Sequence, residues 1–169
     1  MAAVHRLLPV LGLAVLSACA GTQTPQPPRG GPELVLGSEG LDVGTTGLEI
    51  GFGRAPEGAI AAISGATGSR PVADAMRADC GGANLREVRF DNGLSVYFRD
   101  RMLIGWSLSG MPEGRLATAA GLTTGLTREA ALSLPGVVPA GAGLAAGQIA
   151  GRLGPDGRVI RLQSGRTCG

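Results

Sequence analysis

The sequence predicts an α+β domain of two layers, in which short helices pack on one face of an antiparallel sheet. Two observations predict this class. Residues 86–108 alternate apolar and polar side chains between turn signals, and a helix-like segment precedes a strand-like segment twice along the chain. Helices followed by antiparallel strands are typical of a sheet covered on one face. The two degenerate modules of helix plus strands would occupy about residues 45–110 and 119–169.

The first 18 residues have the three parts of a secretory signal. Arg6 supplies a positive charge, residues 7–16 are apolar, and the small residues Ser17 and Ala18 follow. An apolar stretch of this length is too short to cross a bilayer. We therefore expect residues 1–18 to be a signal peptide that is removed.

The motif Leu16-Ser17-Ala18-Cys19 resembles the lipobox of bacterial lipoproteins. The resemblance implies that the Cys19 thiol receives diacylglycerol, that cleavage makes Cys19 the first residue, and that its amino group is acylated, for example with palmitate. Two or three acyl chains together give stable anchoring. An ordinary cleaved signal, in which Cys19 is incidental, is the alternative.

The residue after the lipid-bearing cysteine predicts the membrane. In the better-studied lipoproteins an Asp at this place retains the protein at the inner membrane, and here Ala20 follows. The resemblance therefore implies the periplasmic face of the outer membrane, with the inner membrane as the alternative. Residues 19–33 are rich in Pro and Gly and have no apolar periodicity, which predicts an extended tether. Residues 34–169 would form a single domain.

Charge and composition argue against a nucleic-acid partner. The chain has 15 basic residues, all of them Arg, against 13 acidic residues, and its formal net charge is +2. The arginines are spread along the sequence, whereas nucleic-acid binding needs a clustered basic surface. All five aromatic residues lie between positions 52 and 106, so the bulky part of the core should lie there.

The cysteine count predicts a disulfide. If Cys19 is acylated, Cys80 and Cys168 remain in an oxidising compartment and should pair with each other. A reactive thiol or a metal site is the alternative, but no His follows Cys19, so we expect no metal. We also expect no cofactor, because the glycines Gly53 and Gly58 are not followed by the Lys-Ser/Thr of a phosphate-binding loop.

Two short helices are expected. Pro56 suits the first position of one helix, and Thr127 suits the cap of the other. The sequence before each helix shows an internal echo, which suggests two versions of one module. At an offset of 74 residues, the matching positions are Gly47, Leu48, Gly51 and Arg54 with Gly121, Leu122, Gly125 and Arg128.

The strongest strand signals follow these helices. Around the turn Asp91-Asn92-Gly93, and again before Trp106, apolar residues alternate with polar ones, which predicts a three-stranded meander. Around the turn Pro155-Asp156-Gly157 the same pattern predicts a hairpin.

A Gly, a short helix and a meander ending in Gly-Trp form a plan that is similar to the small repeated modules of the β-lactamase-inhibitor-protein and SmpA/OmlA lipoprotein type. It is also similar to uncharacterised secreted proteins and lipoproteins of alphaproteobacteria. The resemblance implies an architecture of helices on a sheet more than it implies a function.

Few residues suggest catalysis. A serine nucleophile usually needs a His or Lys base, and the chain after Cys19 has neither. Carboxylate pairs remain for acid-base chemistry, although Asp in turns is also favoured for its backbone hydrogen bonds. The candidate pairs are Asp74 with Asp79, and Asp91 with Asp100.

One cluster suits protein recognition, because Trp, Tyr and Arg are enriched at binding hot spots. Its members are Tyr97, Arg99, Arg101 and Trp106. The alternation of Trp106 with Ile104 and Leu108 favours a place in the core instead. We therefore expect a non-catalytic, membrane-anchored lipoprotein with a structural or protein-binding role. An inhibitor of a periplasmic or extracellular hydrolase and an enzyme using carboxylates alone are the alternatives.

Overall fold

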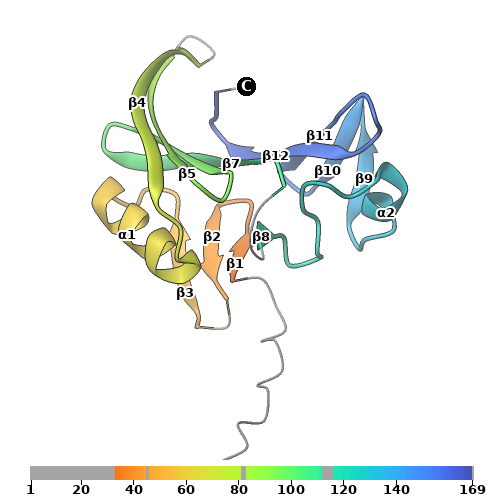
Figure 1. Ribbon diagram of the computed structural model, residues 1–169, viewed down its shortest axis with the longest axis horizontal. Coiled ribbons are helices and arrows are strands. Elements are labelled where there is room, and N and C mark those ends of the chain that lie inside the picture. Colours follow the sequence, from red (N-terminus) through yellow and green to blue (C-terminus); the bar gives the residue numbers. More distant parts are fainter. Residues whose placement is uncertain (1–32, 45, 81–82, 112–115, 169) are drawn as a thin grey trace, which may run out of the picture. The chain divides into compact units, whose positions relative to one another are not determined.

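The computed structural model describes residues 33–44, 46–80, 83–111 and 116–168. The expected signal peptide, Cys19 and nearly all of the expected tether lie outside the described residues. The described part of the chain folds into two β-sheets and two short helices (Figure 1).

The larger sheet has eight strands in the order β4-β5-β6-β7-β12-β11-β10-β9. Every neighbouring pair is antiparallel. The predicted meander and the predicted hairpin are both confirmed within it. The strands are β4 (Pro71–Cys80), β5 (Ala83–Phe90), β6 (Leu94–Arg99), β7 (Met102–Ser109), β9 (Val137–Ala140), β10 (Gly143–Ala146), β11 (Ile149–Leu153) and β12 (Val159–Gly165).

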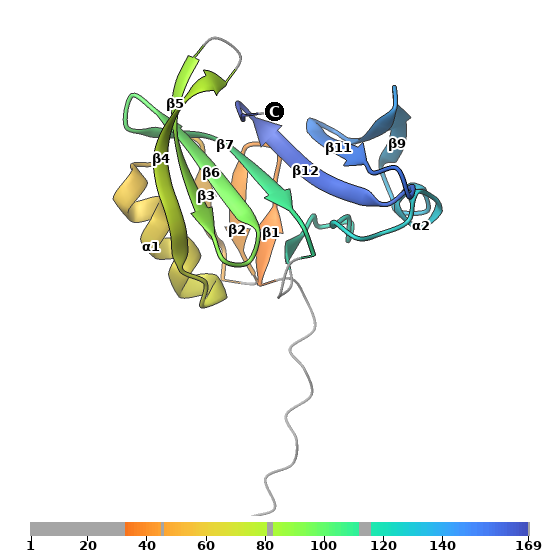
Figure 2. The ribbon, with the colours of Figure 1, turned by 45° about the horizontal axis from the view of Figure 1, so that its top comes forward.

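The smaller sheet has four strands in the order β3-β2-β1-β8. It lies behind the eight-stranded sheet in the view of Figure 2. Strands β1, β2 and β3 form an antiparallel meander, and β8 pairs with β1 in parallel. The strands are β1 (Leu34–Leu36), β2 (Gly40–Val43), β3 (Leu48–Gly51) and β8 (Leu116–Ala117).

The main core lies between the two sheets. Leu34 and Ile50 of the smaller sheet and Val96 of the larger one are fully buried in the same hydrophobic cluster. Trp106 of β7 is also fully buried, and its indole N–H donates to the carbonyl of Gly37 over 2.8 Å. This bond satisfies the one polar group of a side chain that buries a large apolar area. Trp106 therefore joins the sheets by packing and by a hydrogen bond.

Both helices begin as the sequence predicts. Helix α1 (Pro56–Thr67) has Pro56 at its first turn, and it ends at Gly68, whose φ of 70° is left-handed. Helix α2 (Arg128–Leu132) is capped by the Thr127 hydroxyl, which accepts from the Ala130 N–H over 3.2 Å. Ala59 and Ile63 bury one face of α1 in the core.

The predicted α+β class is wrong, because the described part of the chain is predominantly β, with 12 strands in two sheets. The error comes from segments that the sequence marks as irregular. Strands β4 and β10 consist largely of Ala, Gly, Pro and Asp, residues with low strand propensity, and β9 contains a Pro. Pairing with a neighbouring strand holds them extended, and a propensity argument does not capture such pairing.

In chain order, strands β4–β7 follow α1 and strands β9–β12 follow α2, so a helix followed by antiparallel strands does occur twice. The echoed residues in front of the two helices, however, do not fold alike. Leu48–Gly51 is strand β3, whereas the matching residues 122–125 form no strand. The two halves share one sheet, because β7 of the first half pairs with β12 of the second, with Leu108 opposite Leu162. The internal echo itself is a local similarity of sequence between segments with different structures.

Candidate functional site

The eight-stranded sheet has a face that points away from the smaller sheet, which we call the outer face. Side chains of a strand point alternately to the two faces, and Trp106 and Val96 point to the inner one. A row of directly opposed residues with the other orientation crosses all eight strands. It consists of Ala73, Arg89, Ser95, Ser107, Gln163, Ala150, Ala145 and Val138.

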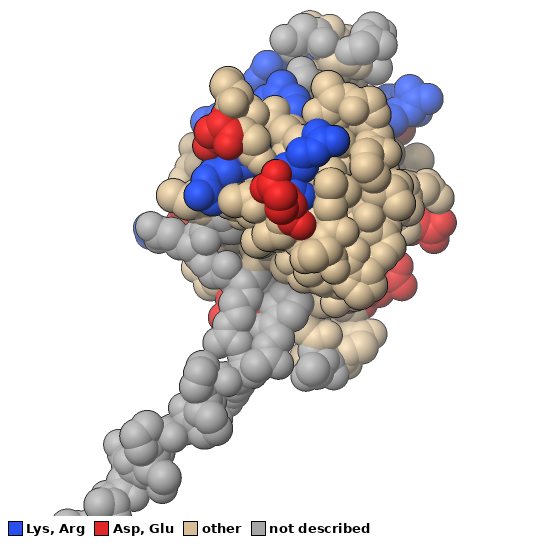
Figure 3. All heavy atoms as spheres, turned by 90° about the vertical axis from the view of Figure 1, so that its right-hand side faces the viewer, with Lys and Arg blue, Asp and Glu red and all other residues tan. Residues whose placement is uncertain are grey.

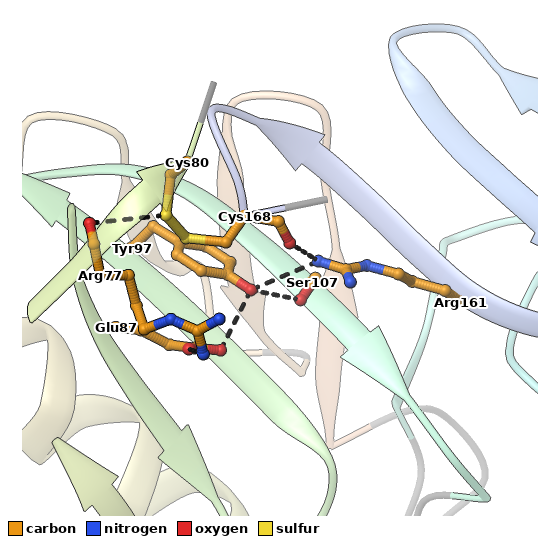
Figure 4. Close-up of polar contacts among 7 residues, drawn as sticks. All are labelled: Arg77, Cys80, Glu87, Tyr97, Ser107, Arg161 and Cys168. Carbon is orange, nitrogen blue, oxygen red and sulfur yellow. Dashed lines mark hydrogen bonds and ion pairs between the residues drawn. A yellow bond between two sulfur atoms is a disulfide. The ribbon is translucent and has the colours of Figure 1, made fainter. Parts of the chain in front are cut away.

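A polar cluster centred on Tyr97 occupies the outer face beside this row (Figure 4). The Tyr97 hydroxyl lies 3.0 Å from Ser107 Oγ, 3.2 Å from Glu87 Oε1 and 3.4 Å from Arg161 Nη2. Glu87 also pairs with Arg77 over 3.2 Å. Strands β4, β5, β6, β7 and β12 each contribute one of these side chains, so the cluster ties the middle of the sheet together.

Burial decides the protonation state of this cluster. Tyr97 is 1% exposed, and its burial raises the pKa of the phenol above 10.0, although the hydrogen bond from Ser107 opposes the rise. The phenol therefore stays neutral at physiological pH. A neutral phenol positions its neighbours through hydrogen bonds and does not act as a base.

The predicted disulfide between Cys80 and Cys168 is confirmed. It joins the end of β4 to the C-terminal tail, and its two Cα atoms are 4.4 Å apart. Cys80 packs with Leu85 and Tyr97 in a second, smaller core cluster, against which Cys168 also packs. The disulfide therefore covers the Tyr97 ring on a face that would otherwise be open to solvent.

Gly105 lets the C-terminal tail cross the sheet at this place. It lies opposite both Tyr97 and Gly165 in the strand register. A Cβ at position 105 would lie 2.1 Å from the carbonyl oxygen of Arg166, which is far inside contact distance. The absence of a side chain lets the tail run directly over β7 toward Cys168.

Arg161 holds the tail from the other side. Its Nη2 donates to the carbonyl of Cys168 as well as to the Tyr97 hydroxyl. Its Nε is buried and has no hydrogen-bond partner within the described residues. The acceptors of Arg161 are thus neutral, and the described part of the chain gives it no acidic partner.

Two hollows lie over the neighbouring strands. One of about 190 Å³ is lined by Ala150, Gly151, Arg152, Arg161 and Gln163. A larger one of about 490 Å³ lies over β10 and β11 and shares Ala150, Gly151 and Arg152 with the first. The rest of the larger hollow is lined mostly by Ala and Gly, so its floor is almost free of charge.

The predicted contact residues divide into two groups. Trp106 is 0% exposed and Tyr97 is 1% exposed, so neither presents its side chain to a partner. Arg101 is exposed and Arg99 partly exposed at the turn between β6 and β7, away from the Tyr97 cluster. Sequence reasoning expected these four side chains to form one surface, and the structure does not bring them together.

Asp91 and Asp100 do not form the suggested pair, and Asp74 is bound to an arginine. Asp74 makes two hydrogen bonds with Arg86, over 2.9 and 2.7 Å, and these bonds lower the pKa of its carboxyl. Asp91 accepts from the Arg70 N–H and lies before β6, whereas Asp100 lies after it. The side chain of Asp79 is outside the description. No metal-binding group of three or more His, Cys, Asp or Glu occurs among the described residues.

No family model, no curated protein and no solved structure matches this chain. Within the described residues no helix is both long enough and apolar enough to span a membrane.

Sequence reasoning missed Arg152, Arg161 and Gln163. The alternation of Arg161 and Gln163 with Leu162 and Ser164 does indicate that the two polar side chains share a face. Their meeting with Arg152 depends on the register of β11 and β12, which shifts between Arg152 and Leu153. Leu153 pairs with Val159, so Ile160 is the extra residue of a bulge. The sequence carries no clear signal for this bulge.

Proposed function

We propose that this chain is a non-catalytic lipoprotein of the cell envelope, anchored through Cys19, whose outer face binds a protein partner. The lipobox-like motif supports the anchor, and Ala20 supports the periplasmic face of the outer membrane. The disulfide supports an oxidising compartment, because disulfides persist there and are rare in the cytosol.

One observation supports the binding role above the others. The outer face gathers the basic residues Arg77, Arg89, Arg152 and Arg161, and Glu87 is its one acidic residue among the described strand side chains. Arg152 lines both hollows described above, and Arg161 lines the smaller one. Arginine beside small, uncharged residues suits a protein interface, since Arg is enriched there.

Globomycin, which blocks the lipoprotein signal peptidase, tests the anchor. Cells that express the full chain should accumulate an uncleaved precursor, which mass measurement distinguishes from the mature form. The variant Cys19→Ala is the matched control, because it removes the attachment atom and leaves the apolar segment intact. Normal processing of the unchanged chain under globomycin would refute the lipoprotein assignment.

Site-specific photo-crosslinking in the native envelope tests the binding face. A crosslinker at the exposed position Ala150 lies on the outer face, and one at Glu57 lies on α1, at an exposed position outside that face. We expect a defined adduct from position 150 that position 57 does not give. Equal adducts from both positions would show that the outer face has no special role.

Inhibition of a hydrolase is the second candidate. The observation that favours it is the tight turn between β6 and β7, where Asp100 has an 80% exposed side chain beside Arg101. An exposed acidic residue on a rigid hairpin tip could enter an active-site cleft. Loss of hydrolase capture on Asp100→Asn, with capture kept on Glu129→Gln, would support this candidate over the first.

A further inference from the structure

Arg152 of β11 and Arg161 of β12 lie side by side on neighbouring strands. They are directly opposite in the register of β11 and β12, so their Cβ atoms lie about 5 Å apart. Like charges in this position destabilise an antiparallel pair. They also line the same hollow of about 190 Å³, together with Gln163. The sheet therefore concentrates positive charge at one small concave site.

The described residues supply no ion pair that neutralises this charge. No ion pair involves Arg152 or Arg161 within the described residues. The sequence has no charged residue between Glu129 and Arg152. In Figure 3, which faces the side of the molecule that carries α2 and β9 in Figure 1, uncharged residues make up most of the visible described surface. An acidic group from outside the chain would meet little competition.

Arg161 is held in place before any ligand arrives. Its Nη2 is committed to the Tyr97 hydroxyl and the Cys168 carbonyl, and no protein acceptor bonds its Nη1 within the described residues. The exposed Arg152 has its whole guanidinium free, and Gln163 adds an amide. A hydrogen-bonded cation and an exposed one thus both line one hollow. The Arg152 guanidinium can therefore bind a carboxylate or a phosphate through paired hydrogen bonds, and Arg161 can add a single bond from its Nη1.

We propose that this hollow binds an oxyanion, a carboxylate or a phosphate group, between Arg152 and Arg161. The larger hollow over β10 and β11 adjoins it at Ala150 and Gly151 and leaves room for the remainder of the ligand. The inference deepens the proposed function, on which it rests, by naming the chemistry of the group that the outer face recognises.

Titration with small anions tests the site without any partner. The full chain carrying Cys19→Ser, with its disulfide intact, is titrated with sodium phosphate and with sodium acetate, and side-chain Arg and Gln signals are followed by NMR. Sodium chloride at equal ionic strength is the control for screening. We expect saturable shifts at Arg152 and Gln163 that chloride does not cause. A stronger response to phosphate identifies a phosphoryl group, and a stronger response to acetate identifies a carboxylate.

Two variants make the test specific. Arg152→Gln should weaken anion binding by about tenfold, the effect of losing a charged hydrogen bond. It should also raise Tm in anion-free buffer, because the repulsion from Arg161 is gone, so failure to fold is not expected. Arg70→Gln makes the same charge change at an exposed position outside the hollow and should leave binding unchanged.

Three results would overturn the proposal. The first is that phosphate and acetate cause NMR shifts no larger than those with chloride. The second is that Arg152→Gln and Arg70→Gln weaken anion binding equally. The third is that phosphate raises the Tm of Arg152→Gln as much as that of the unchanged chain. These results leave the crosslinking from position 150 unaffected. The titration can therefore refute the oxyanion site while a protein partner on the outer face remains. If the crosslinked adduct from position 150 alone is absent, the protein partner is refuted and the oxyanion site is not.

Discussion

Removal of the disulfide is the sharpest test of how this fold is stabilised. The double variant Cys80→Ala/Cys168→Ala opens a link between residues 88 positions apart. In the chain-entropy account, closing a loop of that size removes about 15 cal/mol/K from the unfolded chain, or about 4–5 kcal/mol at 25 °C. The folded state should change little, because the Arg166 N–H still donates to the Ile104 carbonyl over 2.8 Å and holds the tail.

Urea unfolding of both chains measures this difference. Trp106, the one tryptophan, is fully buried and reports unfolding by its fluorescence. We expect the double variant to remain folded in water and to lose about 4 kcal/mol of unfolding free energy, which is a large part of the 5–15 kcal/mol typical of a domain. A loss below about 1 kcal/mol, with an unchanged slope against urea, would refute the entropic argument.

Three further predictions concern single residues. Tyr97, the one tyrosine, should have a pKa above 10.0 in the folded chain and near 10.0 in urea, which absorbance titration checks. Because the unfolded chain then loses this proton first, the free energy of unfolding should fall as pH rises above 10.0. Arg101→Gly should raise stability by up to about 1 kcal/mol, because Arg101 has a φ of 62°; urea midpoints test it, and a decrease would contradict it. Asp74→Asn should cost up to about 1 kcal/mol at neutral pH, a difference that disappears as pH falls below 3.8, since Arg86 lowers the pKa of Asp74; a difference that persists in acid would contradict this.

The central part of the fold could be predicted because its signals are local. Alternation around Asp91-Asn92-Gly93 gives the β5–β6 hairpin, and Gly93 has the positive φ that such a turn needs. Pro56 and Thr127 mark the two helix starts for equally local reasons. Each of these predictions depends on a few neighbouring residues and on no distant contact.

The edges of the large sheet could not be predicted in this way. Strand β4 has no apolar alternation, and its extended form depends on pairing with β5 and on the contacts of Asp74 with Arg86 and of Arg77 with Glu87. Such contacts appear only when the register is known. A slip of one residue would send every side chain of a strand to the opposite face.

The candidate site was hidden for the same reason. The number of cysteines is enough to predict the disulfide. The sequence does not tell, however, that Tyr97 and Trp106 lie on opposite faces of the sheet. The meeting of Arg152 with Arg161 depends on the bulge at Ile160, which the pattern of apolar residues does not indicate. The sequence therefore predicts the disulfide that covers the Tyr97 ring, but it does not predict the pair of Arg152 and Arg161 beside it.

The pairing of β7 with β12 has a consequence for synthesis. Strand β12 pairs with β7 on one side and with β11 on the other, so it joins the two halves of the large sheet. Until residues 159–165 are present, β7 has a bare edge and the eight-stranded sheet remains in two parts. Completion of this sheet must wait for β12, and such long-range closure is slow compared with hairpin formation. A nascent or truncated chain that ends before Val159 should therefore need a chaperone to keep β7 from pairing with other chains.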